Sequence, residues 1–205
     1  MLNLGKFFGD LSIFEIFVSV IAILTGGYTA YKNFLERTKI SLYPADAVRL
    51  IVSSDSSVSK FHLICNLVNK STKTGTLHRL EVKVCDPRNW TYNYVWKLFY
   101  KYSPTGVQIE KETDPYPISV APKDSKVIFV EFKAIEILQS YSWQEGTYEF
   151  KVIGWINRKN RKGPHNLKSN FHIYITSEIL NKLRKHYTKD TAVPVPIAEW
   201  TPCGC

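Results

Sequence analysis

The sequence is poor in cysteine and lacks the common signatures of catalysis. Its four cysteines form no pair of Cys-x-x-Cys motifs, and none of its five histidines has a metal-ligating partner at a recognised spacing. A glycine-rich phosphate loop, a His-Glu-x-x-His motif and a serine nucleophile turn are also missing. We therefore predict no catalytic residue, no metal site and no cofactor, and we expect a protein that is not an enzyme. An enzyme whose site is assembled from dispersed residues is the alternative.

Acidic residues are also scarce, since 18 Asp and Glu stand against 27 Lys and Arg. The excess is concentrated in residues 157–168, which carry five cations and no acid in a predicted hairpin loop. Such clusters attract the anionic lipid of an inner membrane leaflet. Nucleic acid or a nucleotide is the rival anion, and simple solvation is the alternative without a ligand. We predict that an anionic surface or ligand binds Arg158, Lys159, Arg161, Lys162 and Lys168.

Charge is almost absent from one long stretch near the N-terminus. Between Leu11 and Tyr31 the only charged residue is Glu15, which lies where the first turn of a helix would be. A helix of this length is about 30 Å long and matches the hydrocarbon thickness of a bilayer. We predict a transmembrane helix over residues 11–32, between a short N-terminal segment (1–10) and a juxtamembrane linker (33–39). A cleaved signal peptide is the competing interpretation.

Basic residues flank this stretch unequally, with Lys32, Arg37 and Lys39 after it and only Lys6 before it. This asymmetry favours a cytoplasmic location for the C-terminal side. The cysteine spacing matches no compact secreted framework, which favours free thiols in a reducing compartment. We therefore expect a single-pass membrane protein with its C-terminal domain in the cytoplasm. The runner-up topology places that domain outside the cell.

Small residues recur every fourth position within the predicted span. Ala22, Gly26 and Ala30 would share one face of the helix and would let two backbones approach closely. This spacing predicts helix association and a homo-oligomer. The alternative is that small residues are merely common in single spans.

The remainder of the chain has the pattern of an all-β domain over residues 40–176. Short runs rich in Val, Ile, Phe, Tyr and Trp alternate in polarity and are separated by clusters of turn residues, and no amphipathic helical pattern precedes residue 177. In one run Leu80, Val82 and Val84 point one way, and the opposite side, which is expected to face solvent, carries Arg79, Glu81, Lys83 and Cys85. Eight or nine such strands predict either two packed sheets or a closed barrel.

One segment favours the sandwich. Gln144 to Val152 places Tyr148 two residues before an inward-facing Phe150, and this resembles the tyrosine corner of immunoglobulin-like domains. Phe150 stands where antibody domains have cysteine, so the resemblance concerns architecture alone. It implies an immunoglobulin-like antiparallel β-sandwich. An ordinary strand opening with glycine and tyrosine is the alternative.

Two segments follow the predicted sandwich. Residues 177–187 have an apolar stripe and cations toward their end, which predicts a short basic helix. Residues 188–205 are rich in proline and are predicted to be a flexible tail. The tail ends in Cys203-Gly204-Cys205, which is similar to the doubly prenylated ends of some small GTPases, although nothing else in the chain resembles that family.

Aromatic residues crowd the run from residue 90 to residue 102. An aromatic surface for a partner is predicted at Trp90, Tyr92 and Trp96, and the alternative is that these rings line a core and its rim.

These patterns together favour a membrane-anchored binding or scaffolding protein that acts at the inner membrane surface. Its expected partners are membrane lipid and a protein. The alternative is a membrane effector whose β-domain senses a small anionic signal and whose helices oligomerise to perturb the bilayer.

Overall fold

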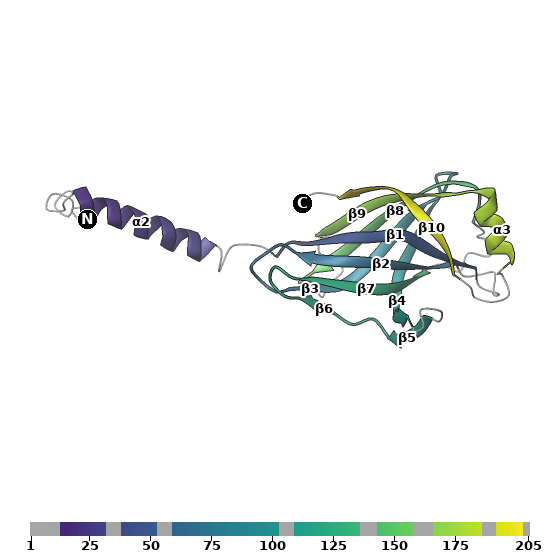
Figure 1. Cartoon of the computed structure of the whole chain (residues 1–205), viewed down its shortest axis with the longest axis horizontal. Helices are drawn as coiled ribbons and strands as arrows, with labels where there is room; N and C mark the ends of the chain where they lie inside the picture. Colours follow the sequence, from purple (N-terminus) through teal and green to yellow (C-terminus); the bar gives the residue numbers. More distant parts are fainter. Residues whose placement is uncertain are drawn as a thin grey trace. The chain divides into compact units, whose positions relative to one another are not determined.

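The computed structural model describes residues 13–31, 38–52, 59–102, 109–135, 143–157, 166–185 and 192–202. The chain divides into two compact units, Met1–Arg37 and Thr38–Cys205. The first unit contains the helix α2, and the second contains the ten described strands and the helix α3 (Figure 1).

Helix α2 (Ile13–Ala30) exposes its apolar side chains throughout. Of the sixteen large hydrophobic side chains that are exposed in the described residues, eleven belong to this helix or to the adjoining Tyr31. Its threonine hydroxyls are satisfied within the helix, since Thr25 donates to the carbonyl of Ile21 (2.7 Å) and Thr29 donates to that of Thr25 (2.8 Å). The helix is long and apolar enough to cross a membrane, as predicted, and a signal sequence would share these properties.

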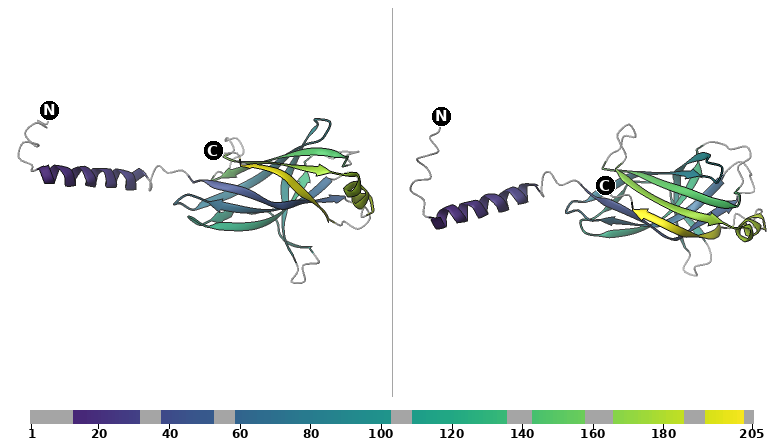
Figure 2. Two further views of the ribbon diagram at one scale, coloured as in Figure 1. Left: turned by 45° about the horizontal axis from the view of Figure 1, so that its top comes forward. Right: turned by 90° about the horizontal axis from the view of Figure 1, so that it is seen from above.

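The second unit is an antiparallel β-barrel. Eight strands follow one another around it in the order β4-β7-β2-β1-β10-β9-β8-β3, and β3 pairs with β4 to close the circle (Figures 1 and 2). The short strands β5 and β6 extend the sheet beside β4 and β3. The strands are β1 (Ile40–Val52), β2 (Ser59–Asn69), β3 (Gly75–Cys85), β4 (Thr91–Tyr102), β5 (Ile109–Thr113), β6 (Ile118–Val120), β7 (Ser125–Ala134), β8 (Gly146–Ile156), β9 (Leu167–Ile175) and β10 (Ala192–Pro202).

The predicted immunoglobulin-like sandwich is therefore wrong. An open sandwich would leave β3 and β4 in separate sheets or at edges, whereas their pairing from Glu81 to Cys85 closes a single sheet. Alternation of inward and outward residues is the same in both architectures, so it could not separate them.

The C-terminal residues also differ from the prediction of a flexible tail. Residues 192–202 form β10, which lies between β1 and β9. Its buried Val193 and Val195 alternate with the exposed Pro194 and Pro196. Proline is rare inside sheets, so the two prolines argued against a strand here. The alternation of buried and exposed residues is nevertheless that of an ordinary strand.

The tyrosine motif forms locally even though the implied fold is wrong. Tyr148 is buried, its hydroxyl accepts the N–H of Gln144 (2.8 Å), and the same hydroxyl donates to the Gln144 carbonyl (3.2 Å). Gly146 has a φ of 134°, and a Cβ there would lie 2.7 Å from the Pro87 ring. The motif thus tightens the entrance to β8 within a barrel.

Aromatic rings occupy the centre of the barrel. The ring of Phe61 lies 5.0 Å from that of Tyr94, 5.1 Å from that of Phe132 and 5.3 Å from that of Phe150, and the last lies 5.0 Å from Phe171. All five side chains are fully buried. An eight-stranded barrel is just wide enough for side chains to fill it. Side chains therefore occupy the place where a wider barrel would hold a ligand.

Helix α3 (Ser177–Lys185) covers one end of the barrel (Figures 1 and 2). Leu183 is buried there, and Ile179 and Leu180 pack against the core. The apolar stripe predicted for this helix is therefore the face that packs on the barrel.

Candidate functional site

The hairpin between β3 and β4 is built around one buried carboxylate. Asp86 is 4 % exposed, and its backbone N–H donates to the Trp90 carbonyl (2.9 Å). Asn89 closes the turn with a φ of 65° and donates its N–H to the Asp86 carbonyl (2.9 Å). Backbone hydrogen bonds from Asp86 to Trp90 and from Asn89 to Asp86 therefore close the turn.

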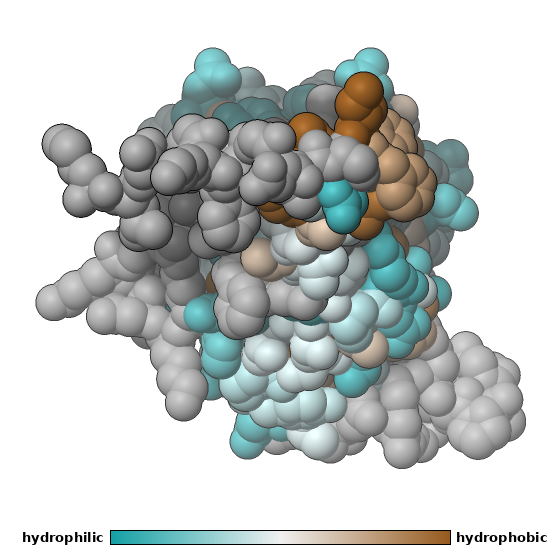
Figure 3. Space-filling view, turned by 90° about the vertical axis from the view of Figure 1, so that its left-hand side faces the viewer, coloured by the Kyte–Doolittle hydropathy of each residue, from teal (hydrophilic) through white to brown (hydrophobic). Residues whose placement is uncertain are grey.

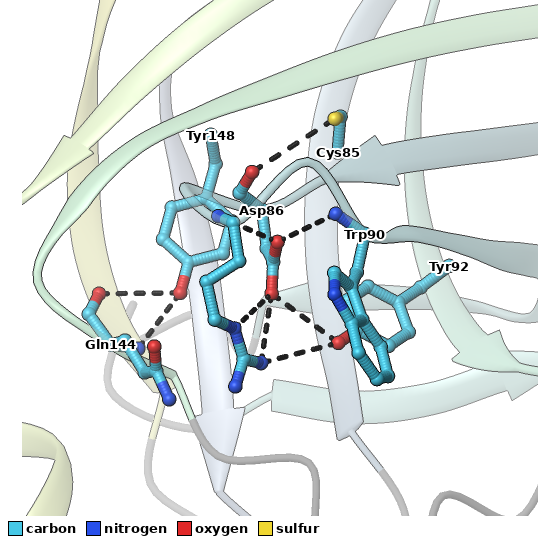
Figure 4. Close-up of polar contacts among 7 residues, drawn as sticks. Cys85, Asp86, Trp90, Tyr92, Gln144 and Tyr148 are labelled. Carbon is cyan, nitrogen blue, oxygen red and sulfur yellow. Dashed lines mark hydrogen bonds and ion pairs between the residues drawn. The ribbon is translucent and has the colours of Figure 1, made fainter.

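Five donors converge on the Asp86 carboxylate (Figure 4). One oxygen, Oδ1, accepts the backbone N–H groups of Arg88 and Trp90, both at 2.9 Å. The other, Oδ2, accepts Nε (3.1 Å) and Nη2 (2.9 Å) of Arg88 and the hydroxyl of Tyr92 (3.3 Å). A carboxylate with this many donors fixes both the backbone of the turn and the Arg88 side chain.

These contacts also determine the charge state of Asp86. Burial would raise the pKa of this carboxyl, but the N–H of Trp90 and the guanidinium and N–H of Arg88 outweigh burial and hold the pKa below its ordinary value. Asp86 is therefore ionised at neutral pH, as its pairing with Arg88 requires.

The hairpin presents an aromatic ring to solvent. Trp90 is 64 % exposed, and the Arg88 guanidinium lies over its ring, 5.5 Å from the centroid. Because Asp86 holds Arg88, the exposed ring lies beside a cation of fixed position. Trp and Arg are the side chains that most often dominate binding at protein interfaces.

An open groove of about 410 Å³ lies beside the hairpin. Cys85, Glu149 and His172 occupy the same row of three adjacent strands, and these residues line the groove together with Asp86, Pro87, Asn89 and Thr147. The groove thus offers a carboxylate, an imidazole and a thiol at the outer surface of the barrel. No group of three His, Cys, Asp or Glu residues among the described residues could hold a metal ion.

A second buried polar contact lies on the outer side of β2 and β7. His62 is 5 % exposed, and its Nε2 lies 3.2 Å from Oε2 of Glu131, its partner in the strand register. The His62 ring also lies 4.1 Å from the ring of Tyr100 on β4. Burial would raise the pKa of Glu131, but the hydrogen bond and charge of His62 lower it. This contact links three neighbouring strands.

The three predicted aromatic residues lie in different surroundings. Trp90 is exposed, whereas Tyr92 is buried in the Asp86 network and Trp96 is half-buried, with its ring 5.5 Å from that of Phe99. Trp90 is thus the one of the three whose ring is largely exposed.

The other predicted site residues fall in two places. Arg158, Lys159, Arg161 and Lys162 lie outside the described residues, and Lys168 is exposed on β9. Ala22, Gly26 and Ala30 are exposed on α2, where a Cβ added to Gly26 would meet no atom within 4 Å.

Sequence reasoning missed Asp86 and Arg88. The sequence Asp86-Pro87-Arg88-Asn89 is typical of a turn between strands, and this signal could have located the hairpin. The contact of Tyr92 with Asp86 depends on the register of β3 with β4, which the sequence does not display.

We expect Asp86→Asn to lower the free energy of unfolding by about 1–3 kcal/mol at neutral pH, because it leaves Arg88 without its anionic partner. The folded-state pKa of Asp86 is depressed, so its contribution is present above the unfolded-state pKa of about 4 and is lost as pH falls through the lower folded-state pKa. The variant and the parent should therefore converge in stability at acid pH. Urea unfolding of the full-length protein in detergent, across pH 2.5 to 7, measures this.

Glu199→Gln is the matched control, since it removes an exposed carboxylate on β10. It should change the unfolding free energy by less than about 0.5 kcal/mol. A difference between Asp86→Asn and the parent that persists unchanged at acid pH would contradict the electrostatic role assigned to Asp86.

No protein-family model matches the sequence, and no curated protein matches it. Among solved structures, the chain is similar to a Bordetella pertussis protein designated ApaA, with 7 % identity, a TM-score of 0.31, and coverage of 81 % of this chain and 91 % of that one. It is also similar to the sporulation control protein Spo0M of Bacillus subtilis (5 % identity, TM-score 0.32, 69 % of this chain and 50 % of that one). A Bacteroides uniformis β-glucuronidase matches at 13 % identity and a TM-score of 0.33, over 66 % of this chain and 13 % of that one. Likenesses this distant carry no argument about function or descent.

Proposed function

We propose that this protein is a single-pass membrane protein that holds a β-barrel binding module at the inner surface of the membrane and catalyses no reaction. The observation that carries this proposal is helix α2, which exposes a continuous apolar surface with Glu15 as the sole charged residue among Ile13–Ala30. Exposed apolar surface of this extent is unfavourable in water and favourable in lipid.

The proposed orientation rests on charge. Lys32, Arg37 and Lys39 follow the helix and Lys6 precedes it, and such an excess is retained on the cytoplasmic side. The barrel follows the helix in sequence and would then be cytoplasmic.

The proposed binding role rests on the β3–β4 hairpin. Trp90 is exposed on a turn that the buried Asp86 already holds in place. Because this turn is ordered before binding, it would lose little conformational entropy when a partner binds. Since aromatic rings fill the barrel, its outer surface is where we place recognition. We propose a protein partner for this hairpin.

Alkaline extraction of membranes and protease protection test the proposal with the unmodified protein. We expect the full-length chain to stay in the pellet after carbonate washing, and we expect protease to degrade the barrel only after the cells are opened. A chain found in the carbonate supernatant would exclude a spanning helix. Degradation in intact cells would reverse the orientation.

A further inference from the structure

The chain enters the barrel at Thr38, at the end of the barrel opposite α3. Among the segments that meet at this entry end are three: residues 38–40, residues 69–75 from the end of β2 to the start of β3, and residues 120–126 from the end of β6 to the start of β7. The N–H of Lys70 donates to the Lys39 carbonyl (2.9 Å), and the N–H of Lys123 donates to the Ser71 carbonyl (3.2 Å). Residues far apart in sequence are thereby held side by side.

A buried asparagine fixes these segments. The amide Nδ2 of Asn69 donates to the carbonyls of Lys73 (2.7 Å), Val120 (3.0 Å) and Ala121 (3.0 Å). Its Oδ1 accepts the N–H (3.0 Å) and the hydroxyl (2.6 Å) of Ser71. Asn69 is fully buried, so the backbone that carries the entry-end side chains is set by interior hydrogen bonds.

The side chains presented by this end are strongly basic. The three segments contain five lysines and a single acid, Asp124, whose Oδ1 accepts the N–H of Ser125 (2.7 Å). Figure 3, viewed from the side on which β1 begins, shows hydrophilic residues in teal among the described residues. The five are Lys39, Lys70, Lys73, Lys123 and Lys126, of which all but the half-buried Lys73 are exposed.

One of these lysines has an uncommon backbone conformation. Lys123 has a φ of 55° in the turn between β6 and β7, where Gly or Asn is usual, and its Nζ donates to the Lys70 carbonyl. This hydrogen bond ties the Lys123 side chain to the segment between β2 and β3 and so keeps its ammonium group at the entry end.

The linker places a limit on how far this end can be from the helix. Only residues 32–37 separate Tyr31 from Thr38, and a linker of this length reaches at most about 25 Å when fully extended. If α2 spans the bilayer as proposed above, Thr38 must therefore stay near the headgroups.

We infer that the lysine-rich entry end of the barrel docks on the anionic phospholipid headgroups of the membrane that α2 crosses. This inference rests on the proposed function. Lysine ammonium groups bind phosphate-bearing headgroups as point charges without a fixed geometry, which suits a fluid surface. Nucleic acid offers the same phosphate chemistry, but the tether keeps lipid at high local concentration and favours lipid.

The test uses full-length protein in nanodiscs of phosphatidylcholine, alone or mixed equally with phosphatidylglycerol, and measures acylation of each lysine by mass spectrometry. At low salt we expect Lys39 and Lys123 to be acylated about threefold more slowly in the anionic discs, with high salt removing the difference. Lys83 on β3 and Lys185 on α3, both exposed, should be acylated equally in both discs.

Variants separate docking from anchoring. Lys70→Gln, Lys73→Gln and Lys126→Gln together should abolish the lipid-dependent protection of Lys39, while the protein still enters the discs through α2. The matched triple Lys83→Gln, Lys97→Gln and Lys185→Gln should retain that protection. Equal acylation of Lys39 in both discs would overturn the inference. The inference would also fail if added single-stranded RNA protected Lys39 from acylation and phosphatidylglycerol did not. Failure of the protein to enter either disc would instead overturn the proposed function.

Discussion

The double variant Val20→Arg with Leu24→Arg is expected to release the full-length protein from the membrane. Val20 and Leu24 lie four residues apart, on the same face of α2 and near its middle, and both side chains are exposed. An arginine at the centre of a spanning helix costs about 2.5–3.5 kcal/mol on insertion scales, so the pair should cost about 5–7 kcal/mol. The measurement is the fraction of protein that remains in the pellet after alkaline extraction.

The matched control exchanges the two side chains, as Val20→Leu with Leu24→Val, and should leave the protein in the pellet. Retention of the double arginine variant at the level of the parent would show that α2 is not the anchor. Sequencing of the N-terminus of the purified protein separates an anchor from a cleaved signal sequence, because cleavage would remove α2 from the mature chain.

Phe61→Ala should lower the free energy of unfolding by about 3–5 kcal/mol. Phe61 is fully buried, and its ring contacts the rings of Tyr94, Phe132 and Phe150, so truncation leaves a cavity bordered by three aromatic side chains. The rigid closed sheet around the ring cannot collapse far into that space. Urea unfolding of the full-length protein in detergent, monitored by tryptophan fluorescence, measures the loss.

Two controls show whether the effect arises from packing. Phe61→Leu keeps most of the apolar volume and should cost less than half as much as alanine. Val127→Ala removes a side chain that is 55 % exposed on β7, and it should change stability by less than about 0.5 kcal/mol. If Phe61→Ala costs no more than Val127→Ala, the aromatic cluster does not stabilise the barrel.

Alternation along single strands predicted much of the barrel core. Leu80, Val82 and Val84 were expected on one face of a strand, and all three are fully buried. The short helix after residue 176 was also predicted, and α3 begins at Ser177. These features depend on local periodicity, which a single sequence displays directly.

Closure of the sheet could not be predicted in the same way. It depends on which strands pair, and the β3–β4 pairing leaves no pattern in either strand that a sandwich would lack. The tyrosine motif around Tyr148 was a sound local prediction, but its hydrogen bonds to Gln144 join residues four positions apart and carry no information about the far side of the domain.

The candidate sites show the same division between local and tertiary information. Trp90 was singled out for its residue type and is exposed, and its role in binding stays a prediction. Tyr92 was grouped with it, yet its hydroxyl donates to the buried Asp86. The entry-end lysines are separated by up to 87 positions, since Lys39 and Lys126 are both members. Only the meeting of the three segments makes them one surface.

Strand β10 has a consequence for how the protein matures. It follows the other nine described strands in sequence and lies between β1 and β9, so both of those strands keep an open edge until residues 192–202 have been synthesised. Open edges recruit strands from other chains. Synthesis proceeds from the N-terminus, so the sheet cannot close before β10 has been made. A nascent chain that pauses before Ala192 would expose the edges of β1 and β9 and could pair wrongly with other nascent chains on the same messenger RNA.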